Sequence, residues 1–515
     1  MSKKYILIVF LIFCAMQYCP QILRAQEQTA PDPSQISVRF DMKKGTVYQM
    51  INRVSDLTGY YFIYDSELVD NEKKVRVVPG DYHLRDLVRK ITGNGNIELR
   101  IQGSYLLIYL PYVKSNTEPV AEPVIQFDSM LVIRGKLLDR ITGEPVIYGT
   151  VNVEGSSMAA LSNRNGEFML KIPDSLSTAL IRISHMGYLN RLLDASLIAG
   201  RNIDIFLDQK VIPLQEIVVR IIDPKAALRE MLRRREENNQ LSPVHMTTFF
   251  REGVDNKSGF NLTEAVLRIY KTGIQASLSS EQVKILKMRR LTSPGYNDTL
   301  VTRLKSSINS CQMLDLIKNL PDFLDLQYNH YYDFTHTDIT VLDNRRVWVF
   351  SFVQKEEVTD PLFTGKLYVD AENYALLKAT FEINPSYVHK SAETLVLRQS
   401  RHIRATPLSA RYEVSYAPYS GKYYLSHVRA DLELRMKKRG KIFGSNVHVW
   451  FEMANCETDT VNVKRFTAEE RVPTRDFFSE QSYVYDEKFW GQFNTLIPEK
   501  SLVELIRKYD FSYER

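Results

Sequence analysis

The segment 428–436, VRADLELRM, alternates apolar and charged residues without a break. Side chains along a strand point to opposite faces in turn, so this alternation predicts a half-buried antiparallel strand. Residues 411–416 alternate likewise, and residues 363–370 and 374–382 predict a two-strand meander. We therefore expect residues 221–515 to form an α+β domain in which helices pack against a curved antiparallel sheet.

Turn-forming residues at 343–344, 371–373 and 419–421 predict the hairpin turns of this sheet. Residues 224–239 predict a helix that begins at Pro224, a residue suited to the first helical turn. Parts of 306–326 and residues 502–509 predict further helices.

A basic run directly follows the alternating segment and consists of Arg435, Lys437, Lys438, Arg439 and Lys441. It stands between two predicted strands, so we expect it at a hairpin tip. Two interpretations fit: a solvated turn, or contact with phosphate groups of the inner leaflet of the outer membrane.

Residues 131–220 predict a seven-stranded β-sandwich, because short strands alternate there with turns. Asn165 and Gly166 are the strongest hairpin signal in this stretch, since a type I′ turn needs two residues that tolerate positive φ.

This stretch resembles the carboxypeptidase regulatory-like domain that precedes TonB-dependent receptors in Bacteroidetes. The residues that carry the resemblance are Gly135, Asp139, Thr142, Gly143, Glu144, Pro145, Gly149, Val151, Val153, Asn165, Gly166, Glu167, Phe168, Ile172, Pro173, Ser184, Met186, Gly187, Tyr188 and Leu214. The resemblance covers nearly the whole stretch, with a departure at 158–160, where relatives tend to have a glycine-containing turn. It implies no peptidase activity, because the module accompanies carboxypeptidases without being their catalytic part.

Residues 36–112 predict a small βαβ-type module, with strands and two amphipathic helices that end at Gly59 and Gly93. The module resembles the secretin and TonB N-terminal short domain in the Phe40-x-Met42 strand, the 58–64 stretch and the helix-to-hairpin stretch 84–108. The resemblance implies a periplasmic domain that contacts proteins, including anti-sigma regulators. Residues 113–130 predict a linker.

Residues 1–25 read as a signal peptide, with Lys3 and Lys4 before an apolar run that is too short to span a bilayer. We expect export to the periplasm or to the periplasmic face of the outer membrane. Cleavage leaves two cysteines, Cys311 and Cys456. They could form one disulfide or remain two buried free thiols, and the sequence does not decide between these alternatives.

Motifs for catalysis are absent from the sequence: it contains no Gly-x-Ser-x-Gly, no Walker loop, no dinucleotide-type glycine motif and no His-Glu-x-x-His. The net charge of +6 is small for 515 residues, and the sequence contains no long basic tract. Both features argue against nucleic acid as a partner. We expect no enzyme activity, cofactor or metal ion.

Two functions follow from these features. The first is an adaptor or accessory protein for TonB-linked transport or envelope signalling, with a TonB-linked receptor or an anti-sigma regulator as partner. The alternative is a lipid or lipoprotein carrier, because the 365–382 meander resembles the half-barrel of periplasmic lipoprotein carriers. A carrier needs an open apolar groove, whereas a helix that fills the sheet's concave side would leave nothing to bind there.

Overall fold

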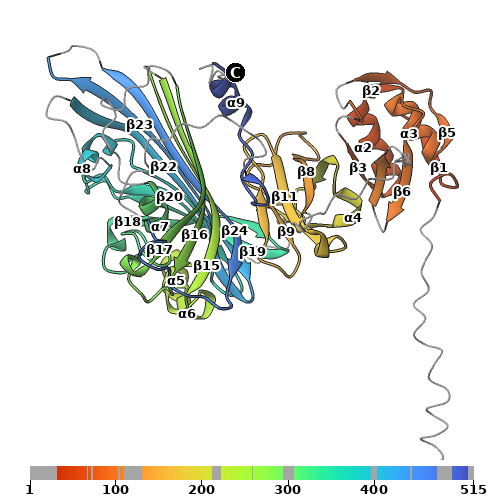
Figure 1. Cartoon of the computed structure of the whole chain (residues 1–515). Coiled ribbons are helices and arrows are strands. Elements are labelled where there is room, and N and C mark those ends of the chain that lie inside the picture. The colour runs from red at the N-terminus through yellow and green to blue at the C-terminus, as the bar shows by residue number, and fades with distance from the viewer. Residues whose placement is uncertain are drawn as a thin grey trace, which may run out of the picture. The chain divides into compact units, whose positions relative to one another are not determined.

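The computed structural model divides the chain into two compact units, one up to Glu118 and one from Pro119 (Figure 1). It describes residues 32–65, 68–70, 73–102, 105–109, 130–210, 222–257, 259–293, 307–395, 403–440, 444–472 and 490–508. The predicted signal peptide lies outside these residues, as does the predicted linker up to residue 129. No helix in this described part of the chain is long and apolar enough to cross a membrane.

The first unit packs two helices against short strands. Its elements are β1 (Ser37–Phe40), β2 (Lys44–Thr46), α2 (Val47–Thr58), β3 (Tyr61–Asp65), β4 (Lys74–Arg76), β5 (Gly80–His83), α3 (Leu84–Thr92), β6 (Glu98–Gln102) and β7 (Tyr105–Tyr109). Helix α2 begins with a capping box, in which the Thr46 hydroxyl accepts from the Gln49 amide at 3.2 Å. Gly59 and Gly93 end the helices at positive φ, as the sequence predicts. Strand β7 pairs in parallel with β3 and antiparallel with β6.

The second unit begins with a β-sandwich. Its elements are β8 (Met130–Asp139), β9 (Thr150–Val153), β10 (Ala159–Leu161), β11 (Glu167–Pro173), β12 (Leu180–Ser184), β13 (Arg191–Asp194), α4 (Ala195–Ile198) and β14 (Asn202–Leu207). Strand β8 pairs with β11 and β14, and the facing sheet has the order β10-β9-β12-β13. The core between the two sheets includes Val151, Phe168 and Ile183, all fully buried.

The predicted hairpin at Asn165 and Gly166 is wrong. Strands β10 and β11 belong to different sheets, so this turn carries the chain from one layer to the other. Only Gly166 has a positive φ, of 78°, whereas a type I′ turn needs two such residues. A Cβ on Gly166 would lie 2.5 Å from the carbonyl oxygen of Leu137, so close approach of the backbone also requires glycine.

A ten-stranded antiparallel sheet follows, as expected, with the order β17-β16-β15-β24-β23-β22-β21-β20-β19-β18. Its strands are β15 (Val244–Asn256), β16 (Gly259–Lys271), β17 (Gln282–Thr292), β18 (Tyr332–Leu342), β19 (Arg345–Gln354), β20 (Phe363–Asp370), β21 (Leu376–Ile383), β22 (Ile403–Tyr419), β23 (Lys422–Lys438) and β24 (Ser445–Asp459). Asp343 and Asn344 both take positive φ in the β18–β19 turn, which is the pattern of a tight hairpin.

The alternation of 428–436 separates the two faces of this sheet. Val428, Ala430 and Leu432 are buried on what we call the inner face, and Arg429 and Asp431 lie on the outer face. Short helices cover the inner face: α5 (Pro224–Arg233), α6 (Arg235–Asn238), α7 (Ser307–Met313) and α8 (Ala392–Leu395). Helix α9 (Lys500–Lys508) ends the described chain. Figure 1 shows the sheet between these covering helices and the sandwich.

Covering residues insert deeply into the inner-face core. Phe323 is fully buried and stacks on Phe352 with ring centroids 4.4 Å apart, and it also contacts the rings of Phe363 and Phe381. Leu316 and Ile317 are buried in the same core. In the described part of the sheet, the chain's own side chains therefore occupy the place where a carrier would need its groove.

We predict that Gly166→Ala destabilises the second unit more than Gly143→Ala does. Both glycines have positive φ, of 78° and 72°, but nothing lies within 4 Å of a Cβ built on Gly143. Gly143→Ala should cost about 1 kcal/mol from backbone strain alone. Gly166→Ala should cost roughly 2–3 kcal/mol because the Leu137 carbonyl must also move. Urea unfolding of both variants measures the difference, and equal costs would contradict the close approach.

Candidate functional site

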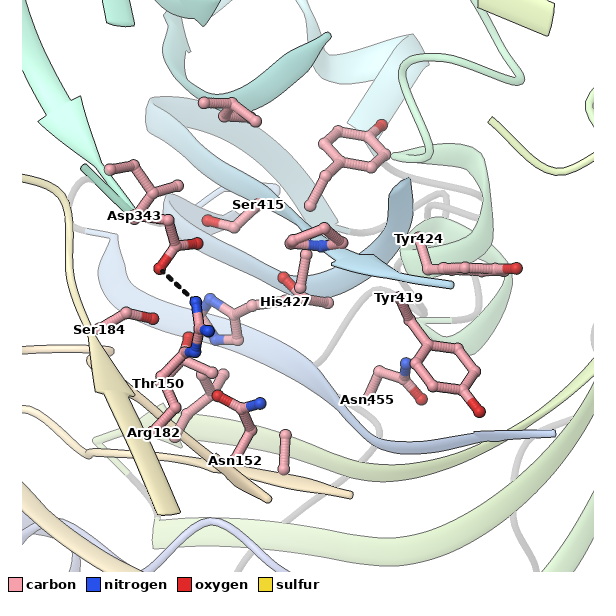
Figure 2. Close-up of a pocket in the computed structure, with 18 of the residues that line it drawn as sticks. Thr150, Asn152, Arg182, Ser184, Asp343, Ser415, Tyr419, Tyr424, His427 and Asn455 are labelled. Carbon is pink, nitrogen blue, oxygen red and sulfur yellow. Dashed lines mark ion pairs between the residues drawn. The ribbon is translucent and has the colours of Figure 1, made fainter. Parts of the chain in front are cut away.

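A pocket of about 470 Å³ lies between the sandwich and the outer face of the large sheet. One wall is the solvent-side face of the sandwich sheet, where Thr150 and Asn152 of β9 stand opposite Ser184 and Arg182 of β12 (Figure 2). Their chain neighbours Val151 and Ile183 point the other way, into the sandwich core. Strand alternation alone thus gives the sandwich one apolar face and one polar face that forms this wall.

The opposite wall is a row of side chains across the large sheet. Lys378 of β21 is the cross-strand partner of Ser415 on β22, which in turn pairs with His427 on β23. Asn455 extends the row onto β24. Val414 and Val428, next in sequence to Ser415 and His427, belong to the inner-face core, so this row lies on the outer face.

Each charged group of the pocket contacts a group of opposite charge. Arg182 makes two hydrogen bonds of 2.5 Å to the Glu154 carboxylate and lies 3.7 Å from Asp343. Lys378 lies 2.8 Å from Glu413. Burial raises the pKa of Glu413, but the Lys378 ammonium outweighs it, and the net pKa lies below its ordinary value. The site therefore has ionised groups whose charges are already largely compensated.

The His427 side chain, in contrast, lacks hydrogen-bond partners in the part of the chain that the structure describes. Its side chain is 1% exposed, and neither ring nitrogen has a hydrogen-bond partner among the described residues. Burial lowers the pKa of His427 to about 4, so the imidazole is neutral at physiological pH. An unsatisfied buried polar group costs about 1–3 kcal/mol. The carbonyl oxygen of the Asn455 side chain, in the same wall, is also buried without a partner.

Tyr148 adds backbone strain beside His427. Its ring lies 4.4 Å from the His427 ring, and its φ of 58° is in the left-handed region that bulky residues avoid. Such a conformation costs about 1–3 kcal/mol and occurs where the surrounding structure forces it, often at functional sites. Two unfavourable features thus meet at one point of the pocket.

Direct contacts fix the two walls relative to each other. The Ser157 hydroxyl donates to the Thr458 carbonyl at 2.8 Å and accepts from the Thr458 amide at 3.0 Å. Asn190 donates to Asp343 at 2.8 Å. Because these bonds join the sandwich to the sheet on the pocket's rim, the cavity lies within one compact unit.

The predicted site residues lie elsewhere. Arg435, Lys437, Lys438 and Arg439 are exposed at the end of β23, next to the turn toward β24, and Lys441 lies outside the described residues. The headgroup contact of this run stays a prediction. In the described part of the chain, no three His, Cys, Asp or Glu side chains are grouped to hold a metal ion.

In the described part of the chain, Cys311 and Cys456 are buried free thiols and form no disulfide with each other. Cys311 belongs to the inner-face core, whereas Cys456 belongs to a separate cluster with Phe249 and Trp490. The sheet separates the two sulfurs, which is why they do not pair.

Comparison with known proteins supports part of the sequence analysis. Residues 133–219 match the family model of the CarboxypepD_reg-like domain, which confirms the carboxypeptidase regulatory-like resemblance for this stretch. The resemblance of residues 36–112 to the secretin and TonB short domain stays a prediction. A search of curated proteins found no match to this chain.

Among solved structures, the chain is similar to a LolA superfamily protein from Nitrosomonas europaea, with 11% identity over 48% of this chain and 96% of that one, and a TM-score of 0.19. A DUF1329 family protein from Desulfovibrio piger has 9% identity over 47% and 96%, with a TM-score of 0.21. Lipovitellin has 10% identity over 44% and 26%, with a TM-score of 0.20. Likenesses at these scores do not bear on function.

We predict that His427→Phe stabilises the protein. Phenylalanine keeps a flat ring next to Tyr148 while removing two nitrogens that lack partners, so the free energy of unfolding should rise by about 1–3 kcal/mol at pH 7. Chemical denaturation measures the change. His330→Phe is the control, because His330 is exposed and lies outside the pocket. Destabilisation by His427→Phe alone would show that the imidazole is well satisfied.

The pH dependence of stability should change with the same variant. The folded-state pKa of His427, about 4, is below its unfolded value of about 6.5, so the unfolded chain binds the extra proton between these values. Stability is therefore lost as pH falls through this window, by up to about 1.4 kcal/mol per pH unit. The advantage of His427→Phe over the wild type should grow from pH 7 to pH 5. A pH-independent difference would contradict the lowered pKa.

Proposed function

We propose that the chain is an exported, non-catalytic binding protein of the bacterial envelope, which takes a small ligand in the pocket between the sandwich and the large sheet. The observation that carries the proposal is the buried His427 side chain without a partner. A bound ligand would supply the hydrogen bonds that the folded chain lacks there.

The location of the pocket supports the proposal. Ligand sites occur preferentially where two domains meet, and a volume of about 470 Å³ is within the usual range for small-molecule sites. The walls are held by direct hydrogen bonds across the joint, so the site is formed before a ligand arrives. Preorganisation of this kind lowers the entropic cost of binding.

The first unit is the basis for proposing an adaptor role. It is compact and separate from the second unit in sequence. Its resemblance to the secretin and TonB short domain implies contact with envelope proteins, such as a TonB-linked receptor or an anti-sigma regulator. A pocket in one unit and a protein-contact module in the other suit a protein that couples a bound ligand to envelope transport or signalling.

Lipid or lipoprotein carriage remains the second candidate, and the composition of the inner face favours it. That face is apolar along many strands, and short helices cover it in place of a second sheet. An acyl chain would enter only by displacing covering residues such as Phe323. This requirement makes carriage a weaker candidate than the pocket, whose space already exists.

We predict that Ser415→Trp abolishes ligand binding without unfolding the chain. Ser415 is partly exposed toward the pocket, so an indole can occupy the space that a ligand would use. A desalted low-molecular-weight extract of bacterial envelopes should raise the melting temperature of the full-length protein and not that of Ser415→Trp.

The matched control is Ser175→Trp, an exposed serine of the sandwich outside the pocket, which should respond to the extract like the wild type. No response of the wild type to the extract would refute the pocket as a ligand site. Mass spectrometry of an organic-solvent extract of the purified proteins tests carriage: acyl lipid retained by both the wild type and Ser415→Trp would favour the inner face.

A further inference from the structure

We infer that the pocket binds a neutral saccharide about the size of a disaccharide, an inference that rests on the proposed function. The chemistry of the two walls selects this class over charged, acyl and peptide ligands. Four features of the pocket carry the inference: its charge balance, its hydroxyl and amide groups, its rings and its strand order.

Charge compensation disfavours ionic ligands. Two cations, Arg182 and Lys378, line the pocket together with the carboxylates of Glu154, Asp343 and Glu413. His185 also lines the pocket, and burial lowers the pKa of His185 and of His427 to about 4, so both are neutral. The five charged groups then give a formal charge of minus one, which repels phosphates and carboxylates. Each cation already has a carboxylate partner within 4 Å, so an anion would have to break an ion pair. A cation would likewise compete with Arg182 and Lys378 for carboxylates that are already paired.

Neutral hydrogen-bonding groups are numerous in the remaining lining, beside apolar side chains such as Met186 and Leu342. They include hydroxyls and amides on both walls, namely Thr150, Asn152, Ser184, Ser415, Ser426, Asn455 and Thr458. A hydroxyl both donates and accepts, and a neutral imidazole carries one donor and one acceptor. The partners that best match such groups are ligand hydroxyls, which also donate and accept. Among neutral ligands, saccharides carry the highest density of such groups.

Aromatic rings provide apolar surface beside these polar groups. The Tyr148 and His427 rings form one pair at 4.4 Å, and Tyr419 and Tyr424 form another with centroids 6.3 Å apart. Figure 2 shows Tyr419 and Tyr424 beside the polar side chains of the row. The C–H faces of a sugar ring are apolar while its edge is hydroxylated, so such a ring can contact both kinds of group at once. An acyl chain would leave the polar groups unsatisfied.

Strand order argues against an extended peptide. Strands β9 and β12, which form the sandwich wall, lie inside the order β10-β9-β12-β13, and the sheet wall is made from interior strands of the large sheet. Their backbone groups are already paired, so a peptide cannot add to this pocket as a further strand. The ligand meets side chains from two sheet faces, which suits a flat molecule held between them.

Calorimetric titration of the full-length protein with a panel of neutral disaccharides tests the inference. The panel includes cellobiose and N,N′-diacetylchitobiose, each with a matched charged probe: cellobiouronic acid as the anion, and deacetylated chitobiose as the cation. At least one neutral probe should bind, and its charged counterpart should bind about tenfold more weakly or worse. Trialanine serves as the peptide probe and should not bind.

Variants connect the binding to the partnerless groups. His427→Phe and Asn455→Leu should each weaken binding of the neutral probe about tenfold or more, because each removes a hydrogen-bonding group from the buried wall. His330→Phe should leave the affinity unchanged. Unchanged affinity of His427→Phe and Asn455→Leu would place the saccharide elsewhere on the protein and overturn the inference.

The two proposals fail in different ways. If no neutral disaccharide binds, or if a charged probe or trialanine binds better, the saccharide inference is wrong. The proposed function still stands in that case, provided that the envelope extract stabilises the wild type and not Ser415→Trp. If the extract has no effect on the wild type, both proposals are wrong.

Discussion

The ion pairs of Glu452 hold the second unit together. This carboxylate is buried on the outer face of the large sheet and lies 3.2 Å from Arg251 and 3.0 Å from Arg429. Burial raises the pKa of Glu452, but the two guanidinium groups hold it below its ordinary value. Loss of these partners would leave a buried carboxylate uncompensated and would destabilise the fold by several kcal/mol. The outer face is therefore stable only when both guanidinium groups are in place.

Segments distant in sequence complete this network. Arg251 also donates to the Leu496 carbonyl at 2.6 Å, and Arg429 contacts Asp431, which Arg164 of the sandwich reaches at 3.3 Å. The sandwich and the C-terminal segment therefore both supply partners to the charged groups on the outer face of the sheet. The joint combines these polar contacts with apolar ones, since Leu161 of the sandwich packs with Phe249 and Trp490. The pocket within it likewise has polar and apolar lining, which suits a ligand with both kinds of surface.

The sequence predicted the strands better than it predicted what covers them. The alternation of 428–436 correctly assigned Val428, Ala430 and Leu432 to a buried face. It also implied that Arg429 faces water, since charged residues are rarely buried unless they are paired. Arg429 is instead buried and paired, because another module packs on it. Periodicity records which side chains share a face, but it does not record which distant segment covers that face.

The sequence did not predict the pocket, for a related reason. Its walls combine a stretch from Tyr148 to Met186 with residues scattered from Leu342 to Thr458, and no short motif joins them. Catalytic spacings and basic runs are visible in a sequence, whereas the informative residues here are single histidines and hydroxyls. His427 looks ordinary in sequence, and only the structure shows that both of its ring nitrogens are buried without a partner among the described residues. Both the strained Tyr148 backbone and the unsatisfied His427 imidazole reduce the stability of the fold. A glycine at position 148 would remove the strain, and a phenylalanine at position 427 would remove the unsatisfied nitrogens. Both costs lie beside a space that a second molecule can enter, and hydrogen bonds from that molecule would offset the cost of His427.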